Sequence, residues 1–214
     1  MIKSIIIDHM GTLVRNESEY IDELIHQCIE NSDLNDAKEA MRVFMDKHDE
    51  LIMLYNNENY KKEYDIALEV FEWEKENYGL NGDLNQYIDL LVKHWKYAPA
   101  FDDTYDFFQD VSMPVYILSN NDTSYIEESM KYHGFHPRGI ISSEMTRCHK
   151  PDINMFEQAL EIVGLPANEI LYVGDSYTKD IEVANKLGMK TLLIGNQHDG
   201  IQTIETLRDV KKYL

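Results

Sequence analysis

Cysteine is nearly absent from this chain of 214 residues, which contains only Cys28 and Cys148. The two residues lie far apart in the sequence, so they form neither a disulfide framework nor a cluster with the spacing of a metal site. Such sparse use of cysteine is typical of proteins in a reducing compartment. We therefore expect a cytoplasmic location.

Long hydrophobic runs are also missing. No stretch approaches the roughly 20 apolar residues of a transmembrane helix, and the apolar run after Met1 stops at Asp8, too early for a signal peptide. We expect no membrane-spanning segment. With 43% hydrophobic and 28% charged residues, the composition is typical of a globular protein that buries a substantial core.

Positive charge is scarce, because 20 lysines and arginines stand against 39 acidic residues and leave a net charge of −19 at pH 7. Such a chain repels nucleic acid and anionic membranes, so neither is expected as a partner. Residues 16–98 hold 20 acids and 8 bases, so the excess is concentrated there. We interpret most of it as the solvated faces of helices.

Proline is absent between Val14 and Ala98, and the alternation typical of strands is absent there too. Apolar residues recur instead at helical spacing. This pattern predicts about four helices, at residues 20–29, 41–55, 64–78 and 84–95. The aromatic residues of this block are expected to build its core rather than a substrate site; they include Trp73, Tyr78, Trp95 and Tyr97.

After Pro99 the pattern changes, and short strand-like runs alternate with helical ones. The predicted strands cover residues 115–118, 139–141, 170–173 and 190–194, and the predicted helices cover 124–133, 153–163 and 179–187. Gly134, Gly164 and Gly188 follow these helices, where C-terminal caps belong. Alternation of this kind predicts an α/β fold with a parallel sheet covered on both faces.

The first strand, at residues 2–7, must join the same sheet, because a single strand is not stable alone. The helical block is therefore an insertion after the first strand. We divide the chain into a core of residues 1–14 and 99–214 and an all-helical part of residues 15–98.

Polar and charged side chains are expected together at the carboxyl ends of the predicted strands. Ligands of open parallel sheets bind at the carboxyl ends of the strands. Polar side chains follow four of the predicted strands at these ends, and they are Asp8, Ser119, Asn120, Lys150, Asp175 and Asp180.

Asp8 and Asp175 would repel each other at this edge unless a cation lay between them. Oxygen ligands whose remaining positions are filled by water suit Mg²⁺. Such an ion, together with Lys150, would neutralise an anionic phosphoryl group. Asp8 could then attack phosphorus and form an aspartyl-phosphate.

Four segments together resemble the haloacid dehalogenase superfamily of hydrolases, which includes phosphatases, dehalogenases and phosphonatases. They read Asp-His-Met-Gly-Thr-Leu at residues 8–13, Leu-Ser-Asn-Asn at 118–121, Lys-Pro-Asp at 150–152, and Gly-Asp-Ser-Tyr-Thr-Lys-Asp at 174–180. One such segment alone would be a weak match, but four in order at strand ends are a strong signal. The resemblance implies a modified Rossmann core with a helical cap that closes over the site.

The resemblance also implies roles for individual residues. Asp8 corresponds to the nucleophile, and Ser119 and Lys150 correspond to the groups that bind the phosphate and assist catalysis. Asn120 is a candidate substrate-binding residue beside Ser119. The implied Mg²⁺ ligands are Asp8, Asp175, Asp180 (through water) and the backbone carbonyl of Met10.

Met10 is the departure from the family's pattern. In the phosphatases this position resembles an aspartate that protonates the leaving group and activates water, and a thioether can do neither. Losing a positioned acid or base costs roughly 10²–10⁴-fold in rate. We therefore expect chemistry on groups that leave without a proton, such as halides, acyl phosphates or activated aryl phosphates. His9 is a poor replacement, because strand alternation points it away from Asp8.

Three functions remain open. The first is an Mg²⁺-dependent phosphohydrolase of a small phosphorylated metabolite, with weakened acid–base catalysis. The second is a metal-independent 2-haloacid dehalogenase, for which Arg42 is the candidate to receive the halide; for a phosphonatase, Lys47 is the candidate Schiff-base lysine. The third is a catalytically silent protein that binds a phosphorylated ligand. His149 and Cys148, which precede Lys150, are interpreted as loop residues, and no motif predicts the oligomeric state.

Overall fold

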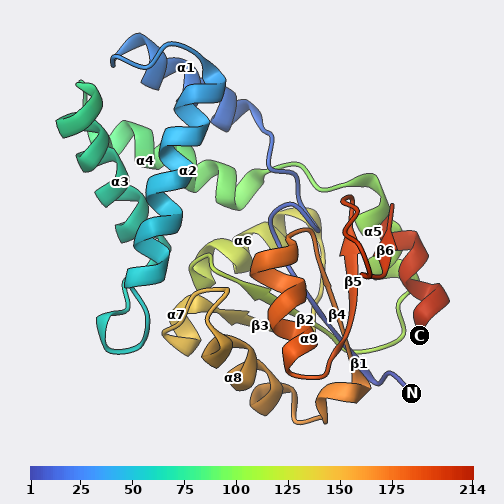
Figure 1. Cartoon of the computed structure of the whole chain (residues 1–214). Coiled ribbons are helices and arrows are strands. Elements are labelled where there is room, and N and C mark those ends of the chain that lie inside the picture. Colours follow the sequence, from blue (N-terminus) through green and yellow to red (C-terminus); the bar gives the residue numbers. More distant parts are fainter.

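Six parallel strands form the centre of the structure, a computed structural model that describes residues 1–214 (Figure 1). The strand order is β3-β2-β1-β4-β5-β6, which confirms the predicted α/β class with its parallel sheet. The bounds are β1 Ser4–Ile7, β2 Val115–Ser119, β3 Gly139–Ser142, β4 Ile170–Gly174, β5 Lys190–Ile194 and β6 Thr203–Ile204. The edge strand β6 was not predicted, because it contains only two residues.

Helices cover both faces of this sheet. Ile5 and Ile7 of β1 pack on one side with α5 (Asp102–Asp110), α6 (Thr123–His133) and the 3₁₀ segment Leu207–Tyr213. Ile6 points to the other side, towards α8 (Ile153–Val163) and α9 (Glu182–Lys186), while the short α7 (Ser143–Thr146) follows β3. All residues of β1 are buried, as expected for a central strand of a parallel sheet.

The helix ends follow the sequence signals. Gly134 and Gly164 cap α6 and α8 in the left-handed conformation, as predicted. The helix α5 was not predicted, because it is short and only Thr104 and Phe107 of its nine residues are buried. None of the helices is long and apolar enough to cross a lipid bilayer.

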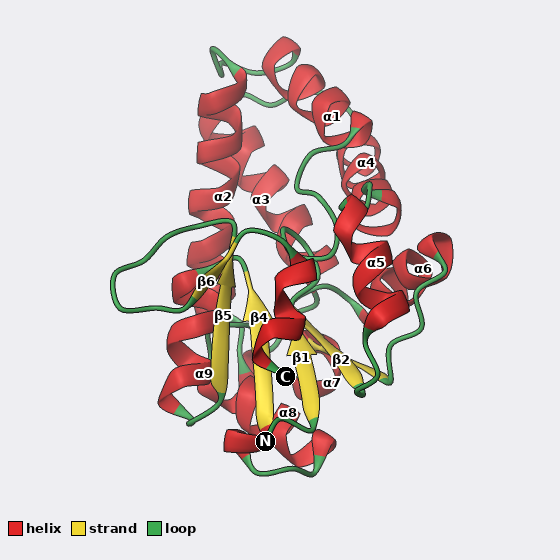
Figure 2. Ribbon diagram, turned by 90° about the vertical axis from the view of Figure 1, so that its right-hand side faces the viewer, coloured by secondary structure: helices red, strands yellow, loops and turns green.

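The inserted block contains the four predicted helices, α1 (Glu19–Glu30), α2 (Ala37–Leu54), α3 (Glu63–Tyr78) and α4 (Leu84–Tyr97). Their apolar faces share a core around Phe71, Ile88 and Leu91. The helix α2 begins four residues earlier than predicted, because the Asp36 side chain caps it by accepting a hydrogen bond from the Glu39 amide. Figure 2 shows these helices above the carboxyl ends of the strands.

The chain passes between core and helical block twice, and the two passages lie side by side. The Arg15 amide donates to the Pro99 carbonyl at 2.8 Å, and the Phe101 amide donates to the Leu13 carbonyl at 3.2 Å. We propose that these paired segments mark the division between a core and a cap at residues 14–15 and 98–99.

Candidate functional site

The strand register brings the predicted site residues to one edge. Ile7 pairs with Ile117 on one side and with Val173 on the other. Asp8 therefore follows one residue after this row, and Ser119 and Asp175 follow two residues after it. Because all three strands are parallel, the three side chains end at the same place.

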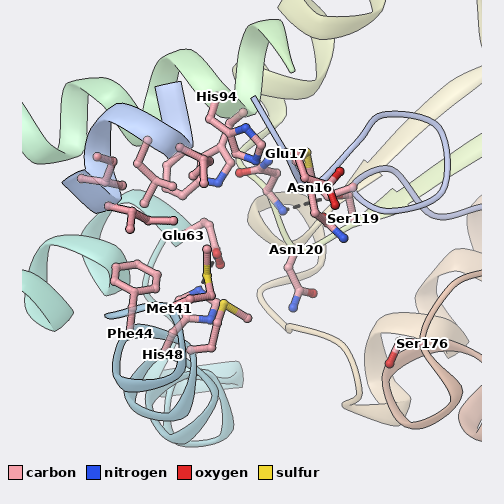
Figure 3. A pocket seen from close by; sticks show the side chains of 18 of the residues that line it. Asn16, Glu17, Met41, Phe44, His48, Glu63, His94, Ser119, Asn120 and Ser176 are labelled. Carbon is pink, nitrogen blue, oxygen red and sulfur yellow. Dashed lines mark hydrogen bonds and ion pairs between the residues drawn. The ribbon is translucent and has the colours of Figure 1, made fainter. Parts of the chain in front are cut away.

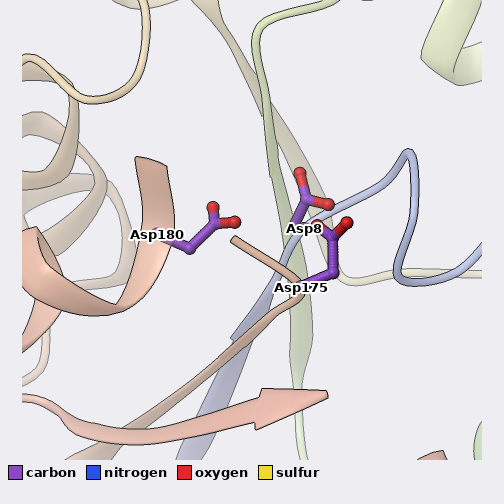
Figure 4. A group of neighbouring side chains, drawn as sticks. All are labelled: Asp8, Asp175 and Asp180. Atoms are coloured by element: carbon purple, nitrogen blue, oxygen red, sulfur yellow. The ribbon is translucent and has the colours of Figure 1, made fainter. Parts of the chain in front are cut away.

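Three carboxylates meet there (Figure 4). One carboxylate oxygen from each of Asp8, Asp175 and Asp180 lies within 4.8 Å of the others. Asp180 comes from a π-helical turn, Tyr177–Ile181, in place of the regular helix predicted from residue 179. Its carboxylate is held by the Tyr172 hydroxyl at 2.7 Å and by the Ser176 amide at 3.2 Å. π-Helical turns are frequent at functional sites.

Lys150 is the cation of this cluster. Its Nζ donates to Asp8 Oδ1 at 2.5 Å and to Asp180 Oδ1 at 2.7 Å. Burial alone lowers the pKa of Lys150, but Asp180 and Asp8 outweigh burial and raise that pKa, so the ammonium stays charged. One ammonium against three carboxylates leaves an excess of two negative charges in a buried site.

The acids of the site show this excess of negative charge. Burial, Asp8 and Asp180 raise the pKa of Asp175 to about 7, and Lys150 offsets only part of this rise. Burial and Asp8 also raise the pKa of Asp180 against the opposing effect of Lys150. Burial is the largest cause of both shifts, and the neighbouring carboxylates add to it.

Two glycines let these acids approach the backbone. Gly11 has a φ of +84°, and a Cβ on it would lie 2.2 Å from Asp175 Oδ2. A Cβ on Gly174 would lie 2.7 Å from Asp180 Cγ. Any larger residue at either position would displace a carboxylate of the cluster.

Ser119 is the last residue of β2 and Asn120 follows it (Figure 3); both line the same cavity as the carboxylates. Ser119 Oγ accepts a hydrogen bond from the Asn121 amide at 3.3 Å. The Asn120 side chain accepts from the Lys150 amide at 2.6 Å and donates to the Lys150 carbonyl at 3.2 Å. Asn120 therefore positions the lysine segment, and its contact with substrate stays a prediction.

Met10 and His9 differ in their access to the site. Met10 lines the cavity above Asp8. His9 is fully buried on the other side, where its Nε2 lies 3.0 Å from Ser129 Oγ of α6. Burial lowers the pKa of His9 to about 3, so this imidazole is uncharged at neutral pH and is not a general acid. His9 faces away from Asp8, as predicted.

A cavity of about 640 Å³ runs from the strand ends into the cap (Figure 3). Its walls include apolar side chains of all four cap helices, such as Leu24, Phe44, Phe71 and Trp95. Trp95 packs in the cap core, as predicted, and it also lines the cavity. The polar groups that the cap contributes were not predicted, and they are Asn16, Glu17, Asp22, His48, Glu63, Glu74 and His94.

The position of Glu74 in the helical pattern could have identified it from the sequence as a buried acid. It follows Phe71 by three residues and Ala67 by seven, so it occupies an apolar position of the helical pattern. An acid at a buried helical position is unusual. Its side chain is only 1% exposed, and its Oε2 has no hydrogen-bond partner.

Glu74 should make stability depend on pH. Burial raises the pKa of Glu74 from 4.5 to about 7, so the folded protein keeps a proton that the unfolded chain releases. The resulting stabilisation is complete below pH 4.5 and is lost as the pH rises through 7. Urea unfolding should therefore show Glu74→Gln to be more stable than the unsubstituted protein by about 3 kcal/mol at pH 8, with a much smaller difference at pH 4.5.

Glu76→Gln is the matched control, because Glu76 is exposed on the same helix. It should change stability little at either pH. An equal effect of Glu74→Gln at both pH values would contradict the pKa that we assign to Glu74.

Arg42 and Lys47 are not at the site. Arg42 is exposed and pairs with Asp46 at 3.2 Å on the outside of α2. Lys47 pairs with Glu50 at 3.0 Å and lies over the Trp73 ring. Neither side chain lines the cavity, so neither can receive a halide or form a Schiff base there.

His149 is fully buried beneath the cap rather than placed at an entrance. Its amide donates to Asn56 Oδ1 at 2.6 Å, and its Nε2 lies 3.0 Å from the Lys61 carbonyl. The Cys148 thiol lies 3.3 Å from Asn57 Oδ1. These residues therefore join the core to the loop between α2 and α3.

Further contacts join the cap to the core next to the carboxylates. Lys179 Nζ lies 2.6 Å from Asp49 Oδ1 of α2, and Lys179 directly precedes Asp180. His48 Nε2 lies 2.6 Å from Glu63 Oε1 inside the cap. Burial lowers the pKa of His48, but Glu63 and Asp49 outweigh burial and raise it to about 9. His48 and Glu63 therefore form a buried ion pair.

Curated relatives include enzymes with phosphatase names. The glyceraldehyde 3-phosphate phosphatase of Methanocaldococcus jannaschii is 27% identical over 200 residues, which cover 91% of this chain and 85% of that protein. The haloacid dehalogenase-like hydrolase domain-containing protein 3 of Danio rerio is 44% identical over 64 residues. That match spans 30% of this chain and 26% of the zebrafish protein.

Solved structures share the whole architecture. The L-2-haloacid dehalogenase of Xanthobacter autotrophicus superposes with a TM-score of 0.79 over 99% of this chain and 98% of its own, at 15% identity. The likeness confirms the predicted Rossmann-like fold with its helical cap. The family described as haloacid dehalogenase-like hydrolase matches residues 2–188. The chain therefore belongs to the haloacid dehalogenase-like hydrolases.

Proposed function

We propose that the protein is an Mg²⁺-dependent phosphohydrolase that acts on a small phosphorylated metabolite through an aspartyl-phosphate at Asp8. The observation that carries the proposal is the buried cluster of three carboxylates with one lysine, whose excess of two negative charges suits a divalent cation. The phosphatase name of the relative that matches most of the chain supports the same assignment.

The cluster also fits Mg²⁺ in its donor atoms. All of them are oxygens, and Asp8 Oδ2 is buried without any hydrogen-bond partner. Asp8, Asp175, Asp180 (through water) and the Met10 carbonyl would hold the ion. A bound Mg²⁺ would neutralise charge on the phosphoryl group and so reduce its repulsion of a carboxylate.

The chain's own residues account for the other parts of the reaction. Lys150 fixes Asp8 Oδ1, which leaves Oδ2 free of protein partners. A bond forms between Asp8 and phosphorus while the bond to the leaving oxygen breaks, and water then hydrolyses the aspartyl-phosphate. Ser119 Oγ and Lys150 Nζ would bind the phosphoryl oxygens. Because Met10 cannot protonate the leaving oxygen, substrates whose leaving groups are stable as anions should react fastest.

Removal of Mg²⁺ tests the proposal. Acetyl phosphate should be hydrolysed in Mg²⁺ and lose at least about 10-fold in rate in excess EDTA, because the carboxylates then repel the substrate. Butyl phosphate should be hydrolysed slowly both in Mg²⁺ and in excess EDTA. Rapid Mg²⁺-dependent cleavage of butyl phosphate would contradict the leaving-group argument, and calorimetry that detects no Mg²⁺ binding would contradict the phosphohydrolase assignment.

Met10 is also compatible with a second candidate function, because the departure of a halide needs no proton. A 2-haloacid dehalogenase would release halide from 2-chloropropionate at a rate that EDTA leaves unchanged. Asp8→Asn would abolish this release. The same assay without any halide release would eliminate this candidate.

A further inference from the structure

A carboxylate that no protein group satisfies lines the cavity within the cap. Glu74 is almost completely buried, and its Oε2 has no partner. Both Glu63 and Glu74 line the cavity, and they lie eleven residues apart on α3. At the rise of an α-helix, that separation spans about 16 Å. The cavity therefore extends from the core junction along α3 into the cap, with room for an elongated ligand.

Charge is divided between the two ends of the cavity. Its only lysines are Lys150 and Lys179, and both come from the core. The cap contributes no lysine or arginine to the lining but four acids: Glu17, Asp22, Glu63 and Glu74. The core end also holds Asp8, Asp175 and Asp180, so it would favour an anion once the proposed Mg²⁺ is bound, whereas the cap lining favours a cation.

The histidines of the cap do not neutralise Glu74. His94 Nδ1 lies 2.8 Å from Ser18 Oγ, and burial lowers the pKa of His94 to about 4, so this ring is neutral. His48 is already paired with Glu63. A buried carboxylate without a counter-charge is costly, and a ligand cation would remove that cost.

Aromatic and aliphatic side chains of the cap also line the cavity. Phe44, Phe71 and Trp95 contribute rings to the wall, with Leu24, Ile25 and Leu91 beside them. Such surfaces pack against hydrocarbon, and the ring faces attract ammonium groups.

We propose that the cap end of the cavity binds a protonated amine through Glu74, and that the substrate is a phosphorylated amine with an apolar segment between its two charged groups. The part of this proposal that concerns the phosphate rests on the proposed function. The part that concerns the amine rests on Glu74 and the cap lining alone. Glu74 is accordingly a specificity-determining residue.

Amine binding is tested without any phosphate. The full-length protein is titrated by calorimetry with 4-phenylbutylamine and with the neutral 4-phenylbutan-1-ol. The amine should bind about 10-fold more tightly than the alcohol, because a charge-assisted hydrogen bond to Glu74 distinguishes them. Glu74→Gln should abolish the preference, and the exposed control Glu76→Gln should keep it. Equal affinities, or a preference that survives in Glu74→Gln, would overturn the proposal.

Turnover separates this inference from the proposed function. The probes are 4-(4-aminobutyl)phenyl phosphate and 4-pentylphenyl phosphate, whose leaving groups are closely matched. The amine should have about a 10-fold higher kcat/KM, and Glu74→Gln should remove the difference. Amine binding without hydrolysis of either ester would contradict the phosphohydrolase and leave the amine site. Equal hydrolysis of both esters without amine binding would contradict the amine site and leave the phosphohydrolase assignment standing.

Discussion

Replacing Met10 with aspartate should raise the rate of butyl phosphate hydrolysis by about 10²-fold or more. The alkoxide is a poor leaving group, and a carboxyl beside Asp8 would supply the proton that it needs. Acetyl phosphate should gain little, because acetate leaves without a proton. Steady-state kcat values for the two substrates, in saturating Mg²⁺, measure this selective gain.

Met10→Asn is the matched control, since the amide has the shape of aspartate but transfers no proton. It should leave butyl phosphate hydrolysis slow. A folded, Mg²⁺-binding Met10→Asp protein without a selective gain would contradict the role that we give to this position. If the unsubstituted protein turned over neither substrate while phosphate raised its Tm, a catalytically silent phospho-ligand-binding protein would replace our proposal.

Replacing Asp8 with asparagine should reduce acetyl phosphate hydrolysis by roughly 10³-fold or more, because the amide cannot form the acyl phosphate. The fold should persist, since the change removes one of the excess negative charges around Lys150. Acid quenching during turnover should trap phosphoprotein in the unsubstituted enzyme and none in the variant. Intact-mass measurement detects this phosphorylation directly.

Asp199→Asn is a suitable control for Asp8→Asn, because Asp199 is exposed in the loop after β5. It should keep both the activity and the phosphoprotein. Full activity in Asp8→Asn would exclude Asp8 as the nucleophile.

The cluster at the carboxyl ends of the strands was predictable from the sequence, because local rules determine where each strand ends. Buried runs identify β1, β2 and β4, and parallel pairing brings their ends together, so Asp8, Ser119 and Asp175 meet as expected. Lys150 comes from the segment after β3, so it was expected at the same ends of the strands. Its contacts with Asp8 and Asp180 agree with that position. The roles that we give these residues still await the experiments above.

The cap side of the site was not predictable in the same way. Helical periodicity identifies α1 to α4, but it does not say which buried face borders a cavity. Trp95 was predicted only as part of the cap core, and the packing of the four helices places both Trp95 and Glu74 on the wall of the cavity. Arg42 failed as a candidate because its position on α2 faces solvent.

The two adjacent passages at Arg15 and Pro99 have a consequence for how such a protein can diversify. The groups proposed for bond breaking stand at strand ends of the core, whereas those proposed for recognition stand on helices that the chain enters and leaves through these two adjacent passages. Substitutions inside the cap can therefore alter which molecule is accepted while the reactive carboxylates keep their arrangement.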